Sequence, residues 1–144
     1  MNPRDFLKQL RHEEIVAAIA DAEKKTSGEI RVFVSHKTVD DPVSDAKAQF
    51  VRMGMTNTRD RNGVLIFVAP RTQKFAVLGD EAVHRLCGEE FWRSMAGEMT
   101  EHFKKADFTH GLVHVVRKAG ELLAQHFPPR PDDTNELPNK LEHD

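Results

Sequence analysis

Acidic and amide side chains stand at the outer ends of two apolar runs that a short turn connects. The runs cover residues 64–69 and 74–78, and the turn between them begins with Pro70. This pattern predicts a β-hairpin, and the outer ends of a hairpin meet in space. We therefore expect four polar residues to gather at one edge of a sheet. They are Asp60, Asn62, Asp80 and Glu81.

A fifth residue, Glu29, begins an earlier strand that we expect to lie parallel to the run 64–69. Its carboxylate would then stand at the same edge of the sheet. Carboxylate and amide oxygens are the ligands that Ca²⁺ and Mg²⁺ prefer. The sequence thus predicts a Ca²⁺ or Mg²⁺ site formed by Glu29, Asp60, Asn62, Asp80 and Glu81.

A purely structural interpretation of the same residues also stands. Asp80 precedes a helix and can cap its first turn, where Glu81 would interact favourably with the helix dipole. Asp60 lies between Arg59 and Arg61 and fits a solvated turn. Both interpretations stay open on the sequence.

The opposite edge of the sheet offers a second set of polar residues. In open α/β sheets, ligands usually bind beyond the carboxyl ends of the parallel strands. The residues expected there are Ser35, His36, Lys37 and Asp40. We favour the acidic edge as the site because more charge gathers there.

The histidines, the cysteine and the tryptophan have structural explanations that do not require a functional site. His110 and His114 have the i, i+4 spacing of some zinc sites, but both fall on the polar face of a predicted helix. The only cysteine, Cys87, lacks a phosphate-binding loop, and we expect it in the core. Trp92 is expected to anchor the core as well.

Composition narrows the classes of function. The chain has 144 residues, with 21 basic and 23 acidic side chains and a net charge of −2. This balance does not favour nucleic acid as a partner. We find no signal peptide, and the longest apolar run is far shorter than the about 20 residues of a membrane helix. We expect a cytoplasmic protein with no direct membrane insertion.

The hydrophobic periodicity predicts a single domain over residues 1–127. Residues 128–144 contain four prolines and predict a flexible tail. We expect helices over 5–10, 13–25, 45–55 and 108–127, and strands over 29–35, 64–69 and 74–78. A further helix should start after Asp80, break near Gly88 and resume over 89–105.

This element order predicts an α/β fold, a three-layer α-β-α sandwich with a small mixed sheet. A helix connects the first two strands, so they should be parallel, and the third should pair antiparallel with the second. The run 64–69 is apolar at every position, as in a central strand covered on both faces. Ser44 or Asp45 is expected to cap the helix 45–55, and Asp107 the last helix.

Several segments together resemble one known family. They are TSGEIRV at 26–32, RNGVLIFVAP at 61–70, FAVLGDE at 75–81, Phe91 with Trp92, HFP at 126–128 and NELP in the tail. The chain resembles the TPM domain, and the resemblance extends over nearly its whole length. In place of the glycine-tyrosine-glycine-leucine-glutamate run of many members, residues 79–83 read GDEAV.

The resemblance implies a compact α-β-α sandwich and, for some members, a divalent cation near the acidic edge of the sheet. It also implies acid phosphatase activity in plant members and, in others, assembly or maintenance of membrane complexes. Many members carry a signal peptide and a membrane anchor, which we do not find here.

Three functions follow as hypotheses. The first is an interaction or assembly module that binds a protein partner or a component of a membrane complex, with a divalent cation at the acidic edge. The second is a metal-dependent, acid phosphatase-like phosphohydrolase, in which the metal and Arg59 or Arg61 stabilise the phosphoryl group. The third is a domain that only stabilises a larger complex.

Overall fold

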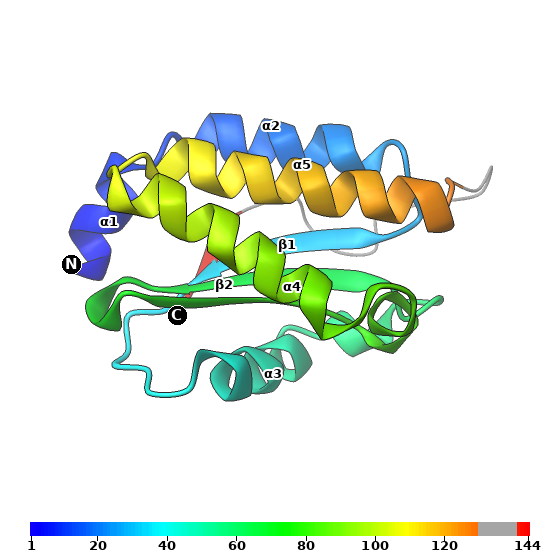
Figure 1. The fold of residues 1–144 in the computed structure, drawn as a ribbon, viewed down its shortest axis with the longest axis horizontal. Helices are drawn as coiled ribbons and strands as arrows, with labels where there is room; N and C mark the ends of the chain where they lie inside the picture. Colours follow the sequence, from blue (N-terminus) through cyan, green and yellow to red (C-terminus); the bar gives the residue numbers. More distant parts are fainter. Residues whose placement is uncertain (130–140) are drawn as a thin grey trace.

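The computed structural model describes residues 1–129 and 141–144 and shows helices packed on both faces of a mixed sheet (Figure 1). The helices are α1 (Pro3–Gln9), α2 (His12–Glu23), α3 (Pro42–Arg52), α4 (Glu81–Lys104) and α5 (Phe108–His126). The strands are β1 (Glu29–Val34), β2 (Gly63–Ala69), β3 (Lys74–Gly79) and β4 (Leu141–His143). Short 3₁₀ turns cover Met55–Asn57 and Pro70–Thr72.

The strand order in the sheet is β3-β2-β1-β4. β1 and β2 are parallel, with Glu29 opposite Gly63, and β3 pairs antiparallel with β2. In Figure 1, α2, α4 and α5 lie on one side of the sheet and α3 on the other. The predicted class, a layered α/β fold with a small mixed sheet, is confirmed.

The fourth strand was not predicted. Leu141 and His143 of β4 pair in parallel with Val32 and Val34 of β1, so the last residues of the predicted flexible tail belong to the sheet. The strand is too short to give a periodic signal, and its side-chain contact between Glu142 and Arg31 joins residues that are 111 positions apart. The rest of the predicted tail, beyond residue 129, lies outside the described residues until residue 141.

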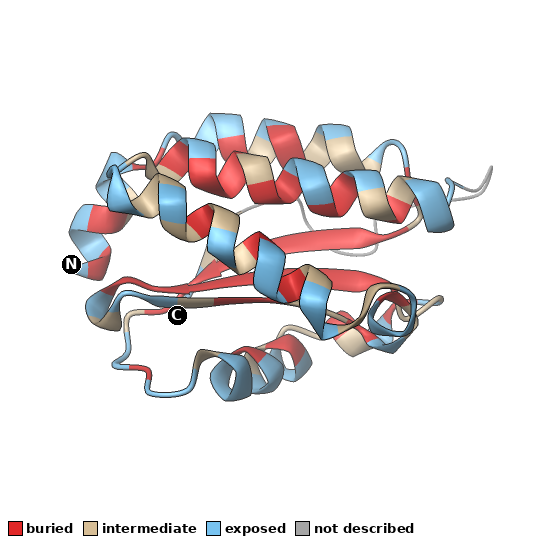
Figure 2. Ribbon diagram, viewed as in Figure 1, coloured by how far each residue is buried: buried red, intermediate tan, exposed pale blue. Residues whose placement is uncertain are grey.

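The core has two parts, one on each face of the sheet (Figure 2). Ile30, Val32 and Val34 of β1 point into the larger part, between the sheet and α2, α4 and α5. Phe33 points into the smaller part, where it stacks on Phe67 with ring centroids 5.8 Å apart. Every residue of β2 is buried, which confirms the prediction of a central strand covered on both faces.

Single residues determine where α3 begins and where α4 breaks. α3 begins earlier than predicted, because the Asp41 carboxylate accepts hydrogen bonds from the backbone N–H groups of Val43 and Ser44 and replaces the predicted caps. The predicted break in α4 is confirmed at Gly88, whose φ of 70° and ψ of −179° lie outside the helical region.

None of the helices in the described ranges combines the length and the apolar character that crossing a membrane requires.

Candidate functional site

Asp80 lies at the centre of the predicted acidic edge, and Arg61 holds it. The Arg61 Nε donates to Oδ2 of Asp80 at 2.7 Å, and its Nη2 donates to Oδ1 at 2.9 Å. The hydrogen bond with Asp80 raises the pKa of Arg61. Asp80 also caps α4, since its Oδ1 accepts from the backbone N–H of Glu81 at 2.8 Å. The structural role proposed for Asp80 is therefore real.

The structure keeps Glu81 close to this pair. Its carboxylate lies 3.9 Å from Nη1 of Arg61 and 3.8 Å from Nη2 of Arg85, and its side chain is 56% exposed. Arg61 itself has a φ of 52°, an uncommon value for a residue other than glycine. Such conformations cost energy, and Gln73 and Ala106 adopt them elsewhere in the fold.

Other predicted ligands make contacts of their own. The Asn62 amide donates to Oγ of Ser27 at 3.2 Å, and Glu29 shares a hydrogen bond with Glu23 beneath α2. Across residues 1–129 and 141–144, no three His, Cys, Asp or Glu side chains are grouped so as to hold a metal ion. In this conformation the residues do not fit a cation, and Ca²⁺ or Mg²⁺ binding at Glu29, Asp60, Asn62, Asp80 and Glu81 stays a prediction.

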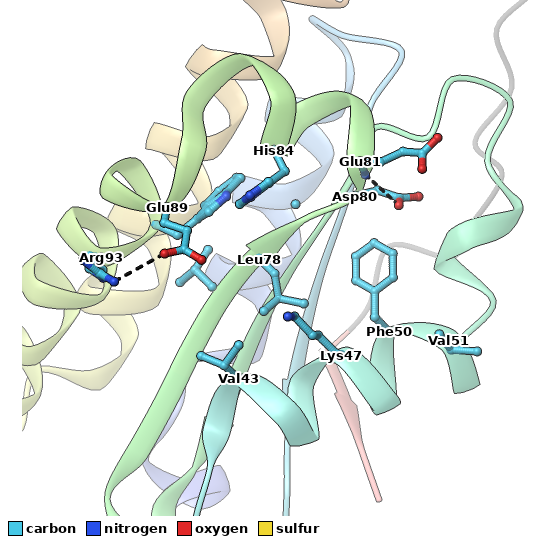
Figure 3. A pocket seen from close by; sticks show the side chains of 13 residues that line it. Val43, Lys47, Phe50, Val51, Leu78, Asp80, Glu81, His84, Glu89 and Arg93 are labelled. Carbon is cyan, nitrogen blue, oxygen red and sulfur yellow. Dashed lines mark hydrogen bonds and ion pairs between the residues drawn. The ribbon is translucent and has the colours of Figure 1, made fainter.

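A cavity of about 520 Å³ opens beside the acidic edge, between α3 and α4 along β3 (Figure 3). We call it the α3–α4 groove. Asp80 and Glu81 form one end of it, and the Glu89–Arg93 ion pair, at 3.3 Å, lies at its rim. The residues that line it are Val43, Lys47, Phe50, Val51, Val77, Leu78, Gly79, Asp80, Glu81, His84, Glu89, Trp92 and Arg93.

The walls of the α3–α4 groove are largely apolar. Val43 and Val51 on α3 are 46% and 63% exposed, unusual values for large aliphatic side chains. Leu78 of β3 forms the floor between the two helices (Figure 3). Exposed apolar surface that lines a concave site is typical of a place where another molecule binds.

Trp92 adds a polar group to this apolar surface. Its side chain is only 7% exposed, and its indole Nε1 finds no hydrogen-bond partner within the described chain. Gly79 makes room for the ring, because a Cβ there would come within 2.5 Å of Cζ2 of Trp92. The sequence predicted Trp92 as a core anchor; the indole is buried as predicted, but its unpaired N–H lies at a groove that the sequence did not reveal.

The backbone of β3 contributes as well. In the sheet as described, β3 is an edge strand that pairs with β2 alone. The Asp80 N–H donates to the Gly63 carbonyl at 2.8 Å, and N–H and C=O groups alternate in direction along an antiparallel strand. The backbone groups of Phe75, Val77 and Gly79 therefore point away from β2, toward the open edge.

At the carboxyl end of β1, the predicted residues contact the last residue of the sequence, Asp144. The Ser35 hydroxyl and the His36 backbone N–H both donate to the Asp144 carboxylate, at 3.0 and 2.7 Å. The Lys37 N–H donates to Oγ of Ser35. Asp40 lies apart from this group, and its carbonyl accepts from Nζ of Lys74 at 2.7 Å.

The histidines at the α4–α5 junction form a surface cluster around Asp107. Its carboxylate lies 2.9 Å from His110 and 3.4 Å from His102, and makes no capping hydrogen bond at the start of α5, contrary to prediction. Partial burial opposes the effect, but the hydrogen bonds from His102 and His110 lower the pKa of Asp107. His114 faces Glu98 at 3.3 Å.

The family model described as the TPM domain matches residues 1–122. The chain belongs to the TPM domain family. Among solved structures, the NMR structure of the BA42 protein from the psychrophilic bacterium Bizionia argentinensis is similar, at 40% identity and a TM-score of 0.83. The match covers 94% of this chain and 96% of BA42. No curated protein matches.

Proposed function

We propose that this TPM domain is an interaction module that receives an extended segment of a partner protein in the α3–α4 groove. The segment adds to the open edge of β3 as a further strand. The partner is a soluble protein or a component of a membrane complex. The observation that carries the proposal is the indole N–H of Trp92, buried and unpartnered within the described chain, at a groove beside an unpaired strand edge.

The chemistry of such docking follows from the groove. A strand that pairs with β3 would hydrogen-bond to the outward backbone groups of Phe75, Val77 and Gly79, while its alternate side chains meet the helices on either side. Val43 and Val51 supply apolar contact on α3, and one carbonyl of the segment accepts from Nε1 of Trp92.

A peptide selection tests this proposal. Peptides selected from a random library on the full chain should shift the amide signals of β3 and α3 in NMR spectra. Trp92→Phe keeps an aromatic side chain but replaces the indole and so removes the N–H, and should weaken the selected peptides about three- to tenfold, the value of one hydrogen bond.

Leu86→Ala is the matched control, because Leu86 is 52% exposed on α4 and does not line the groove. Peptides whose shifts lie elsewhere, or whose affinity is equal for Trp92→Phe and Leu86→Ala, would refute the assignment of the groove.

In the same proposal, a divalent cation binds at the end of the groove that Asp80 and Glu81 form. Binding there requires Arg61 to release Asp80, because the guanidinium occupies both carboxylate oxygens. Arg61→Gln should therefore bind Ca²⁺ more tightly than the wild-type chain, with NMR shifts confined to residues 60–63 and 80–82. If neither protein shows shifts at millimolar Ca²⁺, the cation does not bind at this edge.

The alternative function, a metal-dependent acid phosphatase-like hydrolase, makes a different prediction. Burial raises the pKa of the Cys87 thiol, which disfavours a cysteinyl-phosphate route, and the hypothesis therefore relies on metal-activated water. Turnover of a generic phosphomonoester with Ca²⁺, Mg²⁺ or Mn²⁺ would then disappear with chelator and in Asp60→Ala and Asp80→Ala. The interaction module predicts no turnover under any of these conditions.

A further inference from the structure

The second edge of the sheet, along β1, is occupied by the last residues of the chain. Leu141 packs against the larger part of the core, and Glu142 and Asp144 point to the opposite face of the strand. This alternation is the ordinary pattern of a strand added to a sheet. The side chains of residues 141–144 therefore indicate which side chains the β1 edge can bind.

Arg31 provides the first recognition element. Its side chain is 4% exposed and forms an ion pair with Glu142. Its Nε is buried without a hydrogen-bond partner in the described residues. A guanidinium has parallel N–H donors that can bind both oxygens of one carboxylate. Arg31 therefore retains an N–H donor that Glu142 does not use.

Ser35 and His36 provide the second element. Besides the two hydrogen bonds already described, Nδ1 of His36 lies 3.1 Å from Oδ1 of Asp144. Although partial burial opposes it, these hydrogen bonds lower the pKa of Asp144. The two elements thus accept carboxylates two positions apart on one face of an added strand.

The segment that occupies the edge is short. β4 has three residues, pairs only with β1 in the described sheet, and leaves His143 and Asp144 at the surface. A strand of three residues with a single neighbour in the described sheet is joined to it by few backbone hydrogen bonds, so it opens locally more readily than the central strands.

We infer that the β1 edge is a docking site for an extended acidic segment of a partner protein, which residues 141–144 occupy in cis as a competitor. The segment carries an acidic residue that meets Arg31 and a second one, two positions later, that meets Ser35 and His36. Strand addition supplies affinity through the backbone, and the two carboxylates supply specificity. This site lies at the opposite edge of the sheet from the α3–α4 groove and does not depend on the function proposed for it.

A peptide competition on the full chain tests this inference. The probe is a fluorescent peptide with the sequence NKLEHD, and the readout is anisotropy. The double substitution Glu142→Ala with Asp144→Ala weakens the tail and should increase peptide affinity at least about tenfold over the wild-type chain, because the cis competitor acts at high effective concentration. A peptide with alanine in place of Glu and Asp should not bind.

Adding Arg31→Met to the tail-weakened chain should abolish binding. Ser35→Ala on the same background is the second variant, and should weaken binding even if Arg31→Met fails to fold. Equal affinity for the wild-type and tail-weakened chains, or binding unchanged by Ser35→Ala and Arg31→Met, would overturn the inference. A wild-type dimer in sedimentation that disappears in the tail-weakened chain would also overturn it, by assigning the site to a second copy of the chain.

Discussion

Glu23 and Glu29 form a pair of carboxyl groups at the beginning of β1, and only one of them needs to carry charge. Oε2 of Glu23 accepts from the Ile30 N–H at 2.7 Å, and the two side chains share a hydrogen bond. Burial first, and then the neighbouring charge of Glu29, raise the pKa of Glu23 from 4.5 to about 9. Glu23 is therefore protonated near neutral pH.

This raised pKa predicts how stability depends on pH. Between about pH 4.5 and about pH 9 the folded chain retains a proton that the unfolded chain has lost, so the free energy of unfolding should fall as the pH rises. Glu23→Gln removes the titration and should flatten this decline in urea unfolding curves at low, neutral and high pH. Glu13→Gln, at an exposed site on the same helix, should retain the wild-type slope. A Glu23→Gln slope equal to that of wild type would mean that this pair does not share a proton.

Gly79 controls the position of the only tryptophan. An alanine Cβ there would meet Cζ2 of Trp92 at 2.5 Å and Cβ of Val83 at 2.9 Å. Gly79→Ala should cost about 1–3 kcal/mol of stability, as expected for overpacking. Because Trp92 is displaced toward solvent, its fluorescence should shift to the red. An unchanged emission maximum would show that the strand, rather than the indole, gives way.

At the scale of the element, α4 combines two helices that Gly88 separates. Its backbone conformation lies in a region that is essentially reserved for glycine, while an added Cβ would meet nothing within 4 Å. The break lets residues 81–87 follow β3 directly, and lets the second half turn Glu89, Trp92 and Arg93 toward the groove. The direction of the groove wall thus depends on one glycine.

Two glycines of α4 provide a matched comparison. Gly88→Ala should destabilise the chain by about 1–3 kcal/mol through backbone strain alone. Gly97→Ala, at a helical position where a Cβ meets nothing within 4 Å, should stabilise it by about 0.5–1 kcal/mol. Thermal unfolding followed by circular dichroism measures both. Equal effects at the two positions would mean that the break at Gly88 is not maintained in solution.

At the scale of the whole molecule, the sheet has two contrasting edges. Helices flank the open edge of β3, whereas the chain's own C-terminus covers the edge of β1. The central strands β1 and β2 are buried along their whole length, and they join the two edges within one sheet. The two proposed docking sites therefore lie at opposite edges of one sheet.

Hydrogen exchange should distinguish these parts of the sheet. Replacing both Glu142 and Asp144 with alanine should speed amide exchange in β1 residues that face β4, by about tenfold or more, while β2 and β3 exchange at the wild-type rate. Exchange that increases equally across the sheet would show that β4 contributes to global stability instead of covering one edge.

Local patterns in the sequence were sufficient for most of the fold. The apolar run of β2 predicted a central strand, the helix between β1 and β2 predicted their parallel pairing, and Gly88 marked the break in α4. These features follow from periodicity, chain connectivity and glycine conformation, which act over a few neighbouring residues. The predicted hairpin also placed Asp80 and Glu81 at the end of β3, where α4 begins.

Only the tertiary structure decided which groups these side chains contact. The pairing of Arg31 with Glu142 joins residues 111 positions apart. The bidentate ion pair between Arg61 and Asp80 forms while Arg61 has an uncommon backbone conformation. That the N–H of Trp92 has no partner among the described residues becomes visible only when α4 packs against Gly79. The sequence shows which side chains can donate a hydrogen bond or carry a charge. Which partner each one meets depends on the distances between side chains, and those distances are determined by the packing of the whole chain.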